Sequence, residues 1–177
     1  CKGGKDLILT LTKGTKNTLS DSQSYKFENS QKQEPDSTIF SDCDIKIQGE
    51  GSLTVKANFK HAIASNDDIK INGGIINITS KKDAFNADDD LTVNGGDFTI
   101  NAGDDAIHAD KNLTINDGLF NIQDCYEGLE GTQIYINGGK ITIKARNDAI
   151  GAAAGTKKTK AFTGRGPNPG VAVHFAG

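Results

Sequence analysis

The sequence contains no methionine and no tryptophan, and its 177 residues include only three cysteines, three prolines and two arginines. The cysteines have neither CxxC spacing nor histidines at zinc-ligand intervals, which excludes a structural zinc site and a disulfide framework. Two arginines and a formal net charge of −3 exclude a nucleic-acid partner, because phosphate binding needs clustered basic residues. Apolar runs fall far short of the roughly 20 residues that a bilayer-spanning helix needs, so we expect no membrane span.

Glycine, aspartate and asparagine are abundant instead: the chain has 21 Gly, 18 Asp and 15 Asn, against only five Glu. These residues favour turns and are poor in helix interiors, so long helices and coiled coils are excluded. Apolar residues make up 35% of the chain, which is enough for one domain with a thin core. Between Asp67 and Asp110, ten Asp occur with three Lys and no Arg, which indicates a region that attracts cations.

An internal repeat of 21 to 24 residues dominates the sequence. Each unit has two pairs of alternating apolar residues and one further apolar position flanked by Ala or Gly, which indicates three short strands. In four of the five units, Asn-Gly-Gly or Asn-Asp-Gly separates the first two strands. The first pair begins at Ile45, Ile69, Leu91, Leu113 and Ile134; the second begins at Leu53, Ile76, Phe98, Phe120 and Ile141; the further position is Ile63, Phe85, Ile107, Leu129 and Ile150.

This period predicts an all-β parallel β-helix in which each unit forms one turn. Asn-Gly between alternating apolar runs is also typical of a β-hairpin, so the alternative is an antiparallel meander or a propeller. A propeller blade needs about 40 residues, whereas three short strands in 21 to 24 residues suit one solenoid turn. With turns stacked about 4.8 Å apart, the apolar columns would form inward ladders, and glycine would supply the corners.

The repeat divides the chain into two parts. Residues 1–152 are expected to form the β-helix turns, with a polar loop insertion at about residues 21–36. Residues 153–177 lose the period and are expected to form an irregular basic and Gly-Pro tail, with room for a last strand at residues 171–175. The first residue, Cys1, is expected to mark either a fragment boundary or the lipid-bearing start of a mature lipoprotein.

Acidic residues lie two positions before the further apolar position in four successive turns: Asp83, Asp105, Glu127 and Asp148. Stacking would bring these carboxylates about 5 Å apart, where each like-charge contact costs about 0.8 kcal/mol in water, so the row needs compensation. Asp88 and Asp110 follow around the next corner, where Asn66-Asp67-Asp68 lies one turn earlier. Carboxylate and carbonyl oxygens are the ligands that Ca²⁺ prefers. We therefore expect a Ca²⁺ site formed by Asp83, Asp88, Asp105, Asp110, Glu127 and Asp148, the alternative being a solvated corner screened by salt.

His108 lies beside the acidic row, where it could serve as a ligand or a base, but its equivalents in the neighbouring turns are Asn86 and Glu130, which favours an exposed, tolerant position without a role. The outward strand positions are mostly polar, and such flat ladders suit a repeating polysaccharide as well as an ordinary solenoid exterior. One ladder is Lys46, Lys70, Thr92, Thr114 and Tyr135, and the other is Thr54, Asn77, Thr99, Asn121 and Thr142.

The segment LTKGTKNTLSDS and the repeated combination of DDφxφxGG with DAφ corners resemble the carbohydrate-binding β-helix family of secreted and surface proteins of clostridia and related bacteria. The resemblance covers about residues 5–152. It implies a right-handed parallel β-helix with Ca²⁺ along acidic corners, and binding to cellulose or to acidic sugars such as polygalacturonate. Asp83, Asp105 and Asp148 match the acidic corner of the family, Glu127 is a substitution there, and His61 departs from the pattern.

We therefore expect a secreted or cell-surface, calcium-stabilised module that binds plant cell-wall polysaccharide and has no catalytic residues. Two other classes remain open. One is a calcium-dependent polysaccharide lyase acting on uronates, with Lys81, Lys82 or Arg146 as the base. The other is a structural surface or adhesin solenoid without a glycan site. The oligomeric state is left open.

Overall fold

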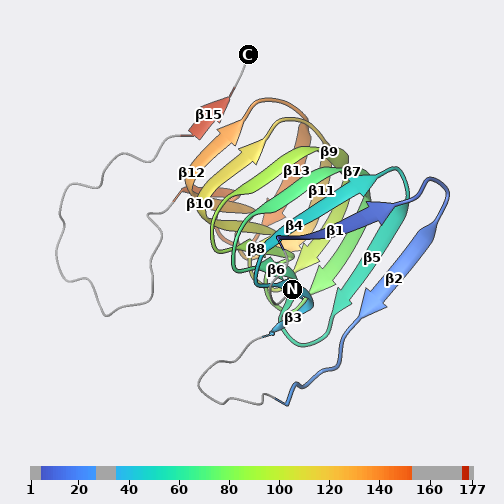
Figure 1. Ribbon diagram of the computed structural model, residues 1–177. Coiled ribbons are helices and arrows are strands. Elements are labelled where there is room, and N and C mark those ends of the chain that lie inside the picture. The colour runs from blue at the N-terminus through green and yellow to red at the C-terminus, as the bar shows by residue number, and fades with distance from the viewer. Residues whose placement is uncertain (1–4, 27–34, 153–172, 176–177) are drawn as a thin grey trace.

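The structure is a computed structural model, and it describes residues 5–26, 35–152 and 173–175. The described residues form strands and turns and contain no helix, so none of them makes a helix that could cross a membrane. Fifteen strands join one sheet that coils into a solenoid of about five turns (Figure 1). All pairings between these strands are parallel, which confirms the predicted all-β parallel β-helix.

The solenoid has three faces, and four strands turn a corner and so contribute to two of them. The first face contains β1 (Asp6–Leu11), β4 (Asp44–Gly49), β15 (Val173–Phe175) and one half each of β7 (Ile69–Ser80), β9 (Leu91–Ala102), β10 (Ile107–Ile115) and β12 (Leu129–Ile136). The second face contains β2 (Lys16–Ser20), β5 (Ser52–Ala57), β11 (Leu119–Cys125), β13 (Lys140–Ala145) and the other halves of β7 and β9. The third face contains β3 (Ser37–Ser41), β6 (His61–Ser65), β8 (Phe85–Ala87), β14 (Ile150–Ala152) and the other halves of β10 and β12.

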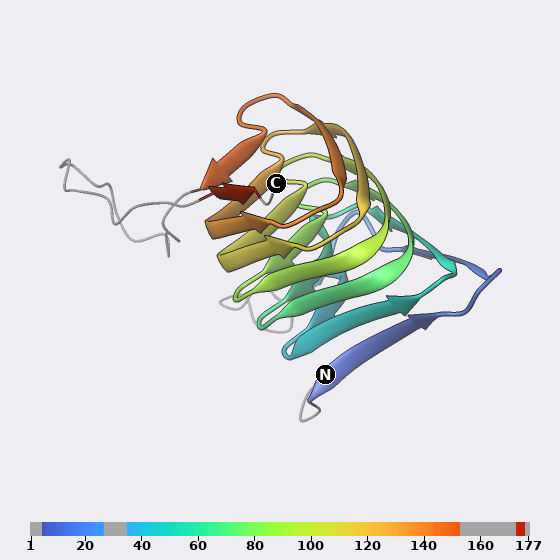
Figure 2. The ribbon, with the colours of Figure 1, turned by 90° about the horizontal axis from the view of Figure 1, so that it is seen from above.

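The register of the strands agrees with the columns read from the sequence. Ile45 pairs with Ile69 on the first face, Leu53 with Ile76 on the second, and Ile63 with the next residue of its column on the third. In Figure 2 the colours follow one another from blue to orange, so consecutive turns lie over one another. The antiparallel meander is therefore wrong: the Asn-Gly segments are corners of a continuous coil, because the chain never folds back on itself there.

The inward columns form one core along the axis of the solenoid. Ile45, Ile71 and Leu91 are completely buried, as are most members of the three columns. Phe98 and Phe120 stack with their ring centroids 4.5 Å apart and nearly parallel planes. Each turn alone is too thin to bury these side chains, so the stability of every turn depends on its neighbours.

The corner between the first and second faces requires glycine and is bordered by an asparagine ladder. Gly96 has a φ of +125°, and a Cβ there would lie 3.0 Å from the carbonyl oxygen of Gly74 one turn away. The side-chain amides of Asn72, Asn94, Asn116 and Asn137 are linked from turn to turn by hydrogen bonds of 2.7 Å. The Asn-Gly repeat therefore serves both the bend and a longitudinal hydrogen-bonded chain.

The insertion and the tail are described in part. Residues 27–34 and 153–172 lie outside the described residues. Within the insertion, the ring of Tyr25 stacks on Phe59 at a centroid distance of 4.6 Å, and its hydroxyl donates to the Asp21 carboxylate at 2.8 Å. In the tail, β15 pairs with β12, so a short strand is present within the expected 171–175 segment.

Candidate functional site

The structure places the predicted acidic row along the third face, with one acid in each of four successive turns. Burial decreases along this row. Asp83 is 5% exposed and Asp105 is 8% exposed, whereas Glu127 is half-buried and Asp148 is exposed. Two carboxylates are therefore taken out of water, and each needs partners in the protein.

Polar groups from three turns contact Asp83. Its Oδ1 accepts a hydrogen bond from the backbone N–H of Asp105 at 3.1 Å, and its Oδ2 accepts one from Nδ2 of Asn86 at 2.8 Å. Nδ1 of His61 lies 3.0 Å from the same Oδ2. Burial alone would raise the pKa of Asp83, but His61, Asn86 and the backbone N–H outweigh it and lower that pKa. Asp83 is thus an ionised carboxylate that links three turns.

His108 lies between three carboxylates. Its Nδ1 lies 2.6 Å from Oε2 of Glu130 and 3.4 Å from Oδ2 of Asp105, and its Nε2 lies 2.9 Å from Oδ1 of Asp110. Burial alone would lower the pKa of His108, but these three carboxylates raise it to about 11, so the ring is an imidazolium at neutral pH. The interpretation of His108 as an exposed residue without a role is wrong, because it is half-buried and carries the charge that the row needs.

The carboxyl groups around this imidazolium differ in the direction in which their pKa values are shifted. Burial raises the pKa of Asp105 to about 7, and the negative charges of Glu130 and Asp83 add to this effect while His108 opposes it. The hydrogen bond with His108 lowers the pKa of Glu130. The cluster therefore distributes its negative charge unequally, with Glu130 as the ionised partner of His108.

Of the six predicted calcium ligands, the structure brings Asp83 and Asp105 together, and Asp104 joins them with ligand oxygens within 4.8 Å of one another. The other four lie apart from this group. Asp110 contacts His108, and Glu127 accepts a hydrogen bond from Asn147 at 2.9 Å. Asp88 and Asp148 are exposed. Calcium binding by these six residues stays a prediction. In the Asp83 group, His61 and Asn86 already contact Asp83, and Nζ of Lys82 lies 2.7 Å from Asp104.

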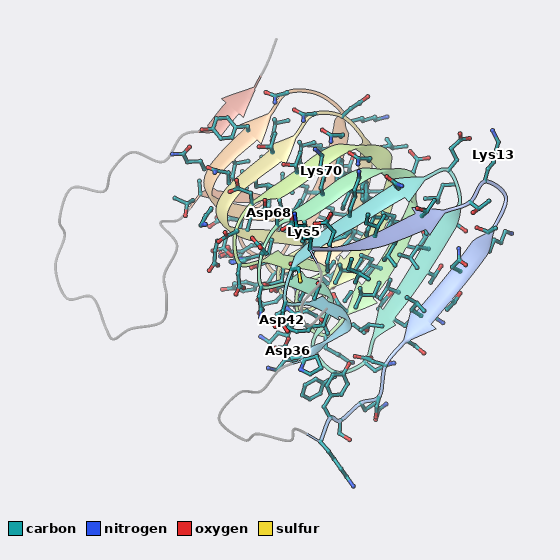
Figure 3. The ribbon with its side chains drawn as sticks, in the orientation of Figure 1. Lys5, Lys13, Asp36, Asp42, Asp68 and Lys70 are labelled. Carbon is teal, nitrogen blue, oxygen red and sulfur yellow. The ribbon has the colours of Figure 1, made fainter. Side chains whose placement is uncertain are left out.

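A second acidic group lies at the corner that leads onto the first face, where Asp44, Asp67 and Asp68 offer oxygens within 4.8 Å of one another. Asp68 is labelled in Figure 3. Burial raises the pKa of Asp44, and the charges of Asp67, Asp68 and Asp6 add to it, opposed by the backbone N–H of Asp68. Among the described residues, no lysine, arginine or histidine forms an ion pair with these three carboxylates. Hard oxygen ligands without a protein cation fit Ca²⁺. Sequence reasoning identified Asp67 and Asp68 as a corner run but missed Asp44, which comes from the preceding turn.

The outward ladder of the second face is also formed as predicted. Thr54 pairs with Asn77, Asn77 with Thr99, Thr99 with Asn121, and Asn121 with Thr142. These uncharged hydroxyls and amides repeat once per turn, about every 4.8 Å along the axis. The face is a regular polar surface that can donate and accept hydrogen bonds at equal intervals.

These features define the class of the protein: it is a parallel β-solenoid with regular polar ladders and acidic corners. Within that class, the chain belongs to the family of carbohydrate-binding domain-containing proteins, whose model matches residues 1–166. The resemblance seen in the sequence is thereby confirmed.

Two known proteins are similar to the chain. A carbohydrate-binding domain-containing protein from Acetivibrio thermocellus is 42% identical over 80 residues, which cover 45% of this chain and 27% of that protein. The solved structure of the polysaccharide lyase-like protein from C. thermocellum, a gadolinium derivative, has a TM-score of 0.74 and 28% identity, and the match covers 82% of this chain and 62% of that one. The chain therefore spans only part of the length of both proteins.

Proposed function

We propose that the chain is a secreted or cell-surface module that binds plant cell-wall polysaccharide, either cellulose or an acidic chain such as polygalacturonate. The observation that carries the proposal is the ladder Thr54, Asn77, Thr99, Asn121 and Thr142 on the second face. A polysaccharide presents hydroxyls at regular intervals, so a ladder of uncharged donors and acceptors can contact several sugar units at once. Membership of the carbohydrate-binding family supports the same function.

Calcium belongs to the proposal as a stabilising ion at the Asp44, Asp67 and Asp68 corner. The three carboxylates repel one another, and a divalent ion would remove this repulsion and fasten the turn of β4 to that of β7. A bound ion at an exposed edge would also offer open coordination positions to the carboxylates of an acidic sugar.

Depletion assays test the function. The protein is mixed with insoluble cellulose, or run in gels that contain polygalacturonate, in buffers with calcium or with a chelator. We expect retention by at least one polymer, and we expect the double variant Thr99→Ala/Asn121→Ala to be retained less. Thr92→Ala, on the outward side of the first face, is the matched control. Equal retention of the double variant and wild type would contradict the assignment of the second face.

A polysaccharide lyase is the second candidate, because the solved structural neighbour is called polysaccharide lyase-like. Two of the three expected bases, Lys82 and Arg146, are poorly suited to the step. A hydrogen bond with Asp104 raises the pKa of Lys82, which keeps that amine protonated. Arg146 donates to the backbone carbonyls of Cys125 and Gly103. Incubation with polygalacturonate, followed by ultraviolet absorbance of unsaturated products, distinguishes the two functions, and product formation would favour the lyase.

A further inference from the structure

A hollow of about 210 Å³ lies on the third face, over β3, β6 and β8. Its shape follows from the register of the outward row, in which Phe40 pairs with Ala64 and Ala64 pairs with Asn86. Phe40 and Asn86 are therefore two strand spacings apart, about 10 Å, with only the methyl group of Ala64 between them. The next members of the row, His108 and Glu130, are large, so the row has a gap at Ala64.

Polar side chains border the hollow on its other two sides. Asp36, labelled in Figure 3, and His61 lie where the strands of this face begin. Ser65, Asn66 and Asp88 lie where the strands end. Phe40 therefore lies at one end of the hollow, and carboxylate, imidazole and amide side chains lie along its edges.

We propose that this hollow binds one neutral sugar ring, at a chain end or on a side branch of a polysaccharide. The inference rests on the proposed carbohydrate-binding function and adds a second contact to the ladder of the second face. A sugar ring has an apolar C–H side that can pack on Phe40, and hydroxyls that can donate to carboxylates and bond to the amide of Asn86. The volume is below the roughly 300–1,000 Å³ of pockets for drug-sized ligands, so it suits a single ring.

Two features of the hollow decide the kind of sugar. Asp36 and Asp88 both line it, and Oδ2 of the buried Asp83 lies 3.0 Å from Nδ1 of His61, which also lines it. Nζ of Lys60 lies 3.1 Å from Asp36 and offsets one of these charges. The lining of the hollow contains two carboxylates and no lysine or arginine, which disfavours the like charge of a uronate and favours a neutral ring. A volume of about 210 Å³ has room for one ring and not for a row of rings, which favours a terminal or branching residue.

Calorimetric titration with a cello-oligosaccharide tests the proposal, and an oligogalacturonate of equal length is the acidic comparison. Ala64→Asn fills the hollow without removing any binding group, and the fold accepts asparagine in this row because Asn86 occupies the same position one turn further. We expect Ala64→Asn and Phe40→Ala each to weaken binding of the cello-oligosaccharide about tenfold or more. Thr12→Asn, at the exposed corner between β1 and β2, is the matched control and should bind like wild type. Thermal melting verifies that each variant is folded.

The outcomes separate this inference from the proposed function. If wild type binds neither oligosaccharide and is retained by neither polymer, the proposed function fails and the inference fails with it. If wild type binds but folded Ala64→Asn and Phe40→Ala bind as tightly, the hollow is not a sugar site and the proposed function is unaffected. If the two variants lose affinity for the oligogalacturonate alone, the assignment of a neutral sugar is overturned.

Discussion

His108 and Glu130 occupy equivalent positions in successive turns, and Nδ1 of His108 lies 2.6 Å from Oε2 of Glu130. The same ring reaches Asp105 and Asp110, so one imidazolium offsets carboxylates from two turns. A cation from the protein itself thus compensates the burial of Asp105, the second most enclosed carboxylate of the row.

The protonation of His108 predicts how stability varies with pH. An unfolded histidine titrates near 6.5, whereas His108 in the folded protein titrates at about 11, so the folded state binds this proton more tightly. The stability that it contributes is complete below about pH 6.5 and is lost as the pH rises toward 11. We expect the free energy of unfolding, measured with urea in the presence of a chelator, to fall between about pH 6.5 and pH 9. His108→Gln should remove most of this slope, and equal slopes in both proteins would contradict the role of His108.

Phe120 tests the dependence of each turn on its neighbours. It is 1% exposed and stacks on Phe98, so Phe120→Ala should lower the free energy of unfolding by about 3–5 kcal/mol. The preceding residue, Leu119, points outward and is 46% exposed, and Leu119→Ala should change stability by less than about 0.5 kcal/mol. Similar urea midpoints for the two variants would be inconsistent with the inward column.

The asparagine ladder makes a smaller contribution. Asn94 donates to Asn72 and accepts from Asn116, so Asn94→Ala removes two side-chain hydrogen bonds at an exposed corner. We expect a loss of about 1 kcal/mol in urea unfolding, because water replaces the lost partners. An unchanged midpoint would show that the ladder is an incidental result of stacking.

Removal of divalent ions tests the calcium proposal. We expect a chelator to lower the melting temperature of wild type and calcium to restore it. Asp68→Asn keeps the oxygen that accepts the Asp90 N–H but loses the charge, so it should weaken this dependence. Asp105→Asn tests the predicted acidic row, and it too should weaken the dependence of the melting temperature on calcium. A melting curve that does not change on chelation would favour the alternative to a calcium site, in which the acidic corners are solvated and screened by salt.

The fold could be predicted almost completely from the sequence, because stacking repeats the same contact in every turn. The columns that begin at Ile45, Leu53 and Ile63 are therefore visible as a period. The candidate site could be predicted only in part. The period places Asp83 near Asp105, but it does not show that His61 and His108 lie between acids from different turns, since that depends on side-chain directions.

The hollow on the third face was not foreseen for a similar reason. A gap in an outward row arises from a small residue between larger ones, and Ala64 between Phe40 and Asn86 is such a case once the register is known. The sequence shows alanine next to most inward residues of this face, including Ile63, Ile107 and Ile150, so alanine alone does not identify an opening.

Binding to polysaccharide is the most direct test of the central claim. Purified protein is incubated with insoluble cellulose and with calcium-gelled polygalacturonate, and the protein left in solution is measured over a range of polymer amounts. We expect saturable depletion by at least one of the two polymers, with release by the matching soluble oligosaccharide. Protein that remains entirely in solution with both polymers, while its melting curve shows a folded domain, would contradict the claim that this solenoid binds plant cell-wall carbohydrate.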